Sequence, residues 1–335
     1  MDIKKALINH KSILTIVILA AMFLINILSG GNDYYMSVIV FILIYIIVCN
    51  GLDILYGYCG QISMGHAAFY AIGCYGSQLL HQYFNLPIPL CMIIISFFSA
   101  AVGALLAYPA SKLVFHFLSL STIAFGEIVY NIALHSPGAI TGDAQGLFGD
   151  QMTFFGEKIT TYSNYFYIVL LCTIILLVLK NFLVSGKTGR AFMAIRENTK
   201  AAAGMGVNVR AYKVIAFATS AFYTAFAGAL YMHIACWCYP NMFQQKQSVL
   251  FVTMLLFGGS GTYVGPIVGP IIVMVITEAL RFLEQYQVFV YGCLLLIVII
   301  ALPGGVYKAA LDLVSSIRNK IMKKKKLEKR GDQVA

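Results

Sequence analysis

Long apolar segments recur along this 335-residue chain and constrain its fold more than any other feature. A membrane-spanning helix needs about 20 apolar residues, within a range of about 17–25. The segment Val249–Gly258 is too short to cross alone, and we expect a half-helix or re-entrant segment that the following Gly-rich break completes. The ten candidate segments are Ile13–Leu28, Met36–Asn50, Ile62–Leu80, Leu90–Tyr108, Leu113–Leu134, Asn164–Phe182, Val214–Ile234, Val249–Gly258, Val264–Phe282 and Val288–Leu302.

Composition supports a membrane protein. The chain is 60% hydrophobic and 11% charged, whereas a soluble protein is roughly 45–50% apolar and about 25% charged. We therefore expect an all-α polytopic membrane protein with about 8–10 transmembrane helices, some of them broken or re-entrant. Residues 1–305 would form one transmembrane domain, and residues 306–335 a basic cytoplasmic tail.

Basic residues predict the orientation. Of the 23 Lys and Arg, eight lie in Arg318–Arg330 and six in the loop Gly186–Lys213. With the lysine-bearing N-terminus inside, counting crossings places this loop and the tail inside, and the loop Ser136–Ser163, whose only basic residue is Lys158, outside. This distribution obeys the positive-inside rule and predicts cytoplasmic N- and C-termini. The charge is not spread over a globular face, so we expect contact with membrane lipid and no nucleic acid.

The segment Gly57–His66 is too polar and too Gly-rich for an uninterrupted span. Glycine permits unusual backbone angles, and non-helical backbone at membrane depth survives only when it is buried in protein or lines a water-filled cavity. The alternative is a tight turn at the membrane edge in which Ser63 caps the next helix. The candidate translocation-path residues here are Gly60, Gln61, Ser63, Gly65 and His66.

Glu127 lies deep in the apolar segment Leu113–Leu134, one to two turns from Ser121 and Thr122. An acid at membrane depth costs several kcal/mol unless it is paired or wetted, so its presence favours a functional role. Glu127 and Thr122 therefore join the predicted path. The alternative is a buried glutamate that is hydrogen-bonded and contributes only to packing.

The outside loop holds a polar, Gly-rich stretch that contains Thr141, Gly142 and Gly146. We expect either a simple turn or a surface that docks an external partner or shapes the mouth of the pathway.

The inside loop Gly186–Lys213 is basic, Ala-rich and helix-forming, which suggests a docking surface for a soluble partner. Its Gly186-Lys187-Thr188 is similar to the end of a phosphate-binding P-loop, but the first glycine of that motif is replaced by Asn181. The motif also needs a preceding strand. We therefore expect no nucleotide site, no bound cofactor and no enzyme activity in this chain. Cys236 and Cys238 lack a second Cys pair or His cluster, so we expect no metal site.

Four motifs occur in order along the chain: GQISMGHAAFYAIG at 60–73, LSTIAFGEIV at 120–129 with TGDAQGL at 141–147, GRAFMAIREN with AAAGMG at 189–206, and GGSGTYVGPIVG at 258–269. Together they resemble the LivM-like permease family of branched-chain amino acid ABC importers. The resemblance covers about residues 36–305.

This resemblance implies that Gly186–Lys213 is a cytoplasmic coupling loop for an ATPase subunit. The importer signature there is E-A-A, three residues, then Gly; Ala201, Ala202 and Gly206 match it, whereas position 200 is Lys. The distal Ile-x-Leu-Pro is missing. The coupling residues that the resemblance indicates are Arg190, Arg196, Glu197, Ala201, Ala202 and Gly206.

The resemblance also implies an assembly in the bacterial inner membrane. Its other members would be a second homologous permease, two ATP-binding subunits that hydrolyse ATP, and an external substrate-binding protein. Urea or short amides are alternative substrates. An ion-coupled secondary transporter that uses Glu127 and His66 as relay groups is a competing interpretation, and an assembly subunit without a path is a third.

Overall fold

The computed structural model describes residues 33–110, 115–154, 157–159 and 161–280, together with 289, 292–293, 296 and 305–309. The long helices are α2 (Asp33–Asp53), α3 (His66–Phe84), α4 (Ile88–Ala110), α5 (Phe115–Leu134), α6 (Tyr162–Ser185) and α9 (Val209–Ala235). The shorter helices are α7 (Lys187–Glu197), α8 (Thr199–Gly204), α10 (Gln245–Gly258), α11 (Gly265–Ala279), the π-helical turn η1 (Ile54–Tyr58) and the 3-10 turns η2 (Pro137–Ala139), η3 (Asp143–Gln145) and η4 (Pro240–Phe243). The strands are β1 (Leu147–Phe148), β2 (Thr153–Phe154), β3 (Glu157–Lys158) and β4 (Trp237–Cys238).

Five described helices are long and apolar enough to cross a membrane: α2 with η1, α4, α5, α6 and α9. They confirm the predicted all-α polytopic class. Their exposed apolar side chains, such as Phe97 and Phe98 on α4 and Leu171 on α6, suit contact with lipid chains. The segment Ile13–Leu28 and most of Val288–Leu302 lie outside the described residues, so the count of 8–10 spans stays a prediction.

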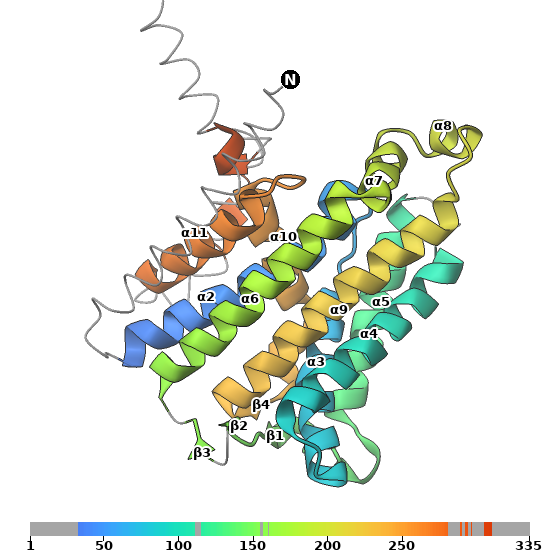
Figure 1. Ribbon diagram of the computed structural model, residues 1–335. Helices are drawn as coiled ribbons and strands as arrows, with labels where there is room; N and C mark the ends of the chain where they lie inside the picture. Colours follow the sequence, from blue (N-terminus) through green and yellow to red (C-terminus); the bar gives the residue numbers. More distant parts are fainter. Residues whose placement is uncertain are drawn as a thin grey trace, which may run out of the picture.

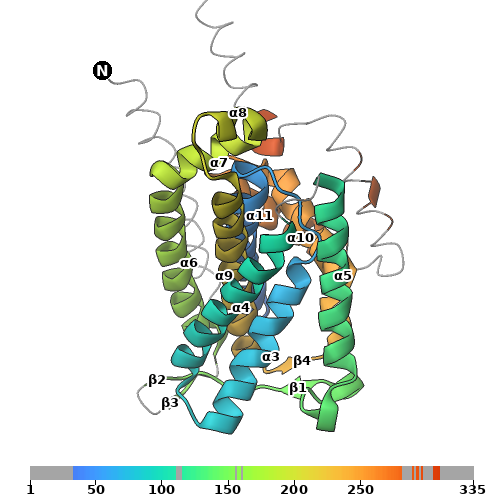
Figure 2. The same cartoon turned by 90° about the vertical axis from the view of Figure 1, so that its right-hand side faces the viewer.

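The long helices run side by side, and the bundle has two distinct ends (Figure 1). Helices α7 and α8 lie at one end, which we call the α8 end, and the strands lie at the other, the β end. Strands β1 and β4 pair antiparallel with Leu147 opposite Cys238, and β2 pairs with β3. Figure 2 shows α5 at one edge of the bundle and α6 at the opposite edge.

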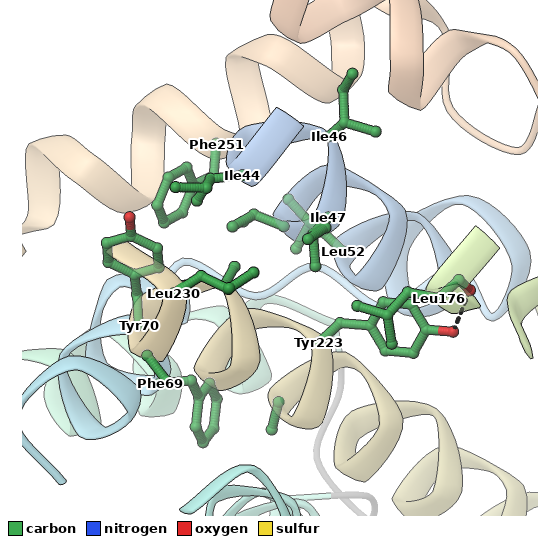
Figure 3. Packing of buried hydrophobic residues seen from close by; sticks show 14 of the residues in the cluster. Ile44, Ile46, Ile47, Leu52, Phe69, Tyr70, Leu176, Tyr223, Leu230 and Phe251 are labelled. Atoms are coloured by element: carbon green, nitrogen blue, oxygen red, sulfur yellow. Dashed lines mark hydrogen bonds between the residues drawn. The ribbon is translucent and has the colours of Figure 1, made fainter. Parts of the chain in front are cut away.

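Glycines allow a close helix contact between α3 and α9. A Cβ added at Gly73 would overlap the Ala225 carbonyl, and one added at Gly228 would overlap the Tyr70 carbonyl. The two backbones therefore touch, as small residues allow in membrane helices. Large apolar side chains from α2, α3, α9 and α10 fill the space around this contact (Figure 3).

Helices α10 and α11 form the broken pair that the short apolar segment predicted. At about 1.5 Å per residue, the 14 residues of α10 are too few to cross about 30 Å of hydrocarbon. The chain then turns through Gly259 and Gly261, whose φ angles are 105° and 71°. Backbone contacts of Gly258 with Gly265 and of Gly269 with Met254 hold α11 against α10.

A buried ion pair joins three of these elements. Lys180 Nζ on α6 lies 2.8 Å from Asp53 Oδ2 at the end of α2, and both side chains are at most 1% exposed. Lys180 also donates to Asn50 Oδ1 at 2.8 Å. The other Asp53 oxygen, Oδ1, accepts from the Gly261 N–H at 2.6 Å. The pair thus fixes α6 and α2 to the break between α10 and α11.

The substitution Lys180→Met should destabilise the protein by about 3–5 kcal/mol, because it leaves the buried Asp53 carboxylate without a counter-charge. A thermal melt of the purified chain in detergent measures the effect. Lys187→Met, at an exposed lysine a few residues further on, is the matched control. Adding Asp53→Asn to Lys180→Met should recover part of the loss. Equal melting temperatures for the two single variants would contradict a structural role for the pair.

Candidate functional site

The Gly57–His66 segment interrupts the helix, as its composition predicts. Helix α2 widens into the π-helical η1, residues 59–65 are non-helical, and α3 begins at His66. Gly60 has a φ of 70°, which allows the chain to turn, and the Gln61 N–H then returns to the Leu55 carbonyl at 3.0 Å. Gln61, Ser63, Gly65 and His66 are buried. This irregular backbone is therefore enclosed by protein, as membrane depth requires.

Ser63 does not cap α3, so that part of the turn interpretation is wrong. The N-cap position is Gly65, which provides no side chain. Ser63 Oγ instead accepts from the Gly65 N–H at 3.4 Å, inside the loop. Ser248 of α10 satisfies the Ala67 N–H in the first turn of α3 at 2.9 Å. A residue 181 positions away thus does the capping, which no local pattern reveals.

Two further polar contacts join the predicted path residues of this segment to α5 and α9. Thr122 Oγ1 accepts from the Met64 N–H at 3.0 Å, and Gly65 lies so close to Thr122 that a Cβ there would overlap the Thr122 carbonyl. His66 Nε2 lies 2.7 Å from Ser220 Oγ, while its Nδ1 is buried without a hydrogen-bond partner. The sequence motifs at 60–73 and 120–129 therefore meet in space.

Glu127 lies on the exposed side of α5, so the alternative of a buried packing glutamate is wrong. Tyr130, one turn further along, donates to Asn241 Oδ1 at 3.0 Å, and Gln244 Nε2 lies 3.3 Å from the same oxygen. Glu127, Tyr130 and Asn131 thus form a polar patch beside η4 and the start of α10. Figure 2 shows that α5 stands at the edge of the bundle, which leaves this patch on an outer face.

Arg196 connects α7 to both helix breaks. Its Nη1 donates a hydrogen bond to the Gly57 carbonyl. A Cβ added at Gly60 would lie 3.0 Å from Arg196 Cγ, and one added at Gly261 would lie 2.6 Å from Nη1. The arginine stem therefore packs on the first break while the guanidinium reaches the second. Two glycines, Gly60 and Gly261, provide the room for it.

The α7–α8 pair presents a small-residue surface at the α8 end. Helix α7 buries Gly189, Ala191, Phe192 and Ile195. Asn198 caps α8, because its side-chain oxygen Oδ1 accepts hydrogen bonds from the backbone N–H groups of Lys200 and Ala201, at 3.0 Å each. Among the predicted coupling residues, Ala202 is buried against the bundle, whereas the others are exposed: Arg190, Arg196, Glu197, Ala201 and Gly206.

The TGDAQG stretch folds into a compact turn at the β end. Thr141 Oγ1 donates to the Ala133 carbonyl at 2.7 Å and so ties the turn to the end of α5. Asp143 Oδ1 accepts from the Ser136 N–H at 3.0 Å. Gly142 and Gly146 have φ angles of 75° and 83°, and Gly146 packs on the Cys238 carbonyl. The glycines are therefore explained by the turn, and docking of an external partner stays a prediction.

The sequence reasoning missed Asp53 and Lys180, although both lie within or beside apolar segments. An ionisable residue at membrane depth is itself the signal that could have identified them. The same signal marks Glu127, whose side chain is exposed, whereas those of Asp53 and Lys180 are buried.

The cysteine pair near the β end has structural positions. Cys236 ends α9 with a φ of 56°, and Cys238 pairs in β4. Burial, together with the Asp150 carboxylate, raises the pKa of the Cys236 thiol, which favours the protonated form over a metal-binding thiolate. Within the residues that the structure describes, no group of three or more His, Cys, Asp and Glu side chains gathers.

Apolar spanning helices with buried breaks and an enclosed polar segment define a multi-pass helical membrane protein. Residues 34–299 match the family described as "Branched-chain amino acid transport system / permease component", and the chain belongs to this family. It is 31% identical over 287 residues to the high-affinity branched-chain amino acid transport system permease protein LivM of Escherichia coli (strain K12), covering 78% of this chain and 67% of that protein.

More distant similarity extends to an archaeal protein. The probable branched-chain amino acid transport permease protein LivM of Methanocaldococcus jannaschii is 23% identical over 248 residues, covering 70% of this chain and 72% of that protein. No solved structure matches the chain.

The substitution Gly60→Ala should destabilise the protein more than Gly206→Ala. Both positions have a positive φ, 70° and 83°, so both variants carry similar backbone strain. Only at Gly60 does the new methyl group press on Arg196, whereas at Gly206 it meets open space. We expect an additional loss of about 1–3 kcal/mol from overpacking. Thermal melts of the two purified variants would contradict the Arg196 contact if they coincided.

Proposed function

We propose that the chain is the transmembrane permease subunit of an ATP-binding cassette importer for branched-chain amino acids. The observation that carries this proposal is the link from the exposed α7–α8 surface, through Arg196, to the two glycine breaks. A soluble subunit that moves α7 would act directly on the segments whose backbone is least constrained by helical hydrogen bonds. The family description and the LivM relatives support the substrate class.

The charge distribution supports an orientation with the α8 end in the cytoplasm of a bacterial cell and both termini on that side. Six Lys and Arg lie in Gly186–Lys213, at the α8 end. The turns η2 and η3 and the strands β1, β2 and β3, at the β end, belong to the loop Ser136–Ser163, whose one basic residue is Lys158. Positive residues favour the cytoplasmic side. The β end would then face the external substrate-binding protein.

The exposed residues of α7 and α8 suit the docking of ATP-binding subunits. Gly204 and Gly206 have open space around them, and Ala201 is exposed, so a partner could approach the α8 backbone closely. Two such subunits would hydrolyse ATP, and this chain would bind no cofactor. Hydrolysis would shift the permease between inward- and outward-facing states, because the ATP-binding subunits would bind these two states with different affinities.

The outer face of α5 suits a second, homologous permease. The α5 helix is the least buried of the five spanning helices. Only 17% of the residues in its apolar stretch are buried, whereas 78% of those in the apolar stretch of α2 are buried. Its exposed Glu127 would be an unfavourable neighbour for lipid chains. A partner chain on this face would place Glu127 beside a path between the two permeases, with Thr122 buried on the opposite side of α5 against Gly65.

The exposed residue Ala201 offers a test of the coupling surface. Ala201→Trp should prevent ATPase subunits from copurifying with the chain and abolish leucine uptake, because the indole ring blocks close approach to α8. The matched control is Ala144→Trp, at an exposed alanine near the β end, which should leave copurification intact. The proposal fails if both variants retain the ATPases. Uptake by the reconstituted chain alone that follows a proton or sodium gradient would favour a secondary transporter.

Glu127→Gln should reduce leucine uptake by the assembled transporter about tenfold, equivalent to about 1.4 kcal/mol, without lowering the melting temperature of the chain. The exposed carboxylate contributes little to folding and would act only in the assembled path. Asn131→Asp, one turn away on the same exposed face, tests whether a second acid is tolerated there. Unchanged uptake in Glu127→Gln would show that the path does not need the charge.

A further inference from the structure

A pocket of about 190 Å³ lies where α2, α3, α9, η4 and α10 meet. It is separate from the Gly57–His66 segment and from the α7–α8 surface. We call it the tyrosine pocket, because half of its lining residues are tyrosines. The lining residues on which the argument depends are Tyr45, Tyr70, Tyr231, Asn241, Lys246 and Gln247.

Tyr70 provides an unused hydrogen-bonding group in this wall. The residue is 4% exposed, and its hydroxyl has no hydrogen-bond partner. Ring contacts with Phe251 at 5.5 Å and Tyr231 at 5.8 Å hold the side chain in place. Figure 3 shows the Tyr70 ring beside Phe251, with the hydroxyl directed away from Leu230. A buried polar group without a partner is costly, so a ligand oxygen or ammonium that reached this hydroxyl would be stabilised.

The hydroxyls of Tyr45 and Tyr231 already have neighbours. Tyr45 is hydrogen-bonded to the side chain of Gln247, and the Tyr231 hydroxyl lies 3.7 Å from Met242 Sδ. Tyr70, in contrast, has a buried hydroxyl that a ligand could engage without breaking an existing contact.

The charge of the pocket selects the ligand. Lys246 lies at the rim, is exposed, and forms no ion pair within the described part of the chain. No carboxylate side chain lines the pocket. A ligand carboxylate would therefore meet a positive charge at the rim. The tyrosine rings would contact an apolar side chain, and their faces also attract an ammonium group. An aliphatic α-amino acid combines these three features.

The size of the pocket agrees with this class of ligand. An engineered apolar cavity of about 150 Å³ holds benzene, and about 190 Å³ is sufficient for a molecule somewhat larger. The rim also adjoins the outer face of α5, because Asn241 accepts the hydrogen bond from Tyr130. Tyr130 is one turn from Glu127, so the pocket lies beside the face on which the path is proposed.

We propose that the tyrosine pocket is a binding site for an aliphatic α-amino acid beside the translocation path, with Lys246 binding the carboxylate and Tyr70 completing the polar contacts. This proposal rests on the proposed function and assigns it a substrate site within the permease itself. Asn241 and Gln247 orient the ligand at the rim, and the rings of Tyr45 and Tyr231 enclose its side chain.

Photolabelling of the full-length chain in lipid nanodiscs tests the proposal. The probe is a leucine analogue with a diazirine in its side chain, and labelled peptides are identified by mass spectrometry. We expect label on the segment that contains Met242 and Lys246, and competition by leucine but not by glutamate. Lys246→Gln should reduce labelling about tenfold and Tyr70→Phe about threefold, as expected for losing an ion pair or one hydrogen bond.

Tyr75→Phe is the matched control. The Tyr75 hydroxyl is also buried, but Tyr75 does not line the pocket, so its loss should leave labelling unchanged. Three outcomes would each overturn the proposal: label scattered along the chain, labelling of Lys246→Gln equal to that of the unsubstituted chain, or competition by a fatty acid instead of leucine.

Leucine uptake by the assembled transporter separates this proposal from the proposed function. If uptake requires the chain but the pocket is not labelled, the pocket assignment is wrong while the permease role stands. If uptake does not require the chain, the permease role is wrong, and pocket labelling then reports a binding site without transport.

Discussion

The buried ion pair between Lys180 and Asp53 is the interaction around which the contacts at the two helix breaks are built. Two charges removed from water are tolerated only when each is paired and hydrogen-bonded, and here Asn50 and the Gly261 N–H complete the set. Because Gly261 belongs to the break between α10 and α11, the pair determines where that break lies. Arg196 then contacts the same break from α7, so its position also depends on the ion pair.

Local composition predicts the breaks in this fold but not the partners that close them. Glycine and polar residues indicated interruptions at Gly57–His66 and after Gly258, because these residue types disrupt helices regardless of the surrounding structure. The partner of Met64 is Thr122, and that of Ala67 is Ser248, at separations of 58 and 181 residues. Such contacts depend on how helices pack, which local patterns do not encode.

Membrane depth and burial are different properties, and sequence indicates only the first. Glu127 and Lys180 both lie within apolar segments, yet one side chain is exposed and the other is enclosed. The difference arises because α5 packs on one side only, whereas α6 packs its Lys180 side against α2. The patch around Glu127 and the tyrosine pocket consequently share one side of the bundle, joined by Tyr130 and Asn241. The polar chemistry of the chain is concentrated where a neighbouring subunit could complete it.

The touching backbones of α3 and α9 restrict how this molecule can change shape. At Gly73 and Gly228 there is no layer of side chains between the two helices that could deform or slide. The two helices must therefore travel as a single stiff body, to which α4 is also packed. Any alternation between open and closed forms has to occur around this body, at the glycine hinges on either side of Arg196 and at the loosely held α5. The permease is in this sense a rigid frame with movable parts at its edges.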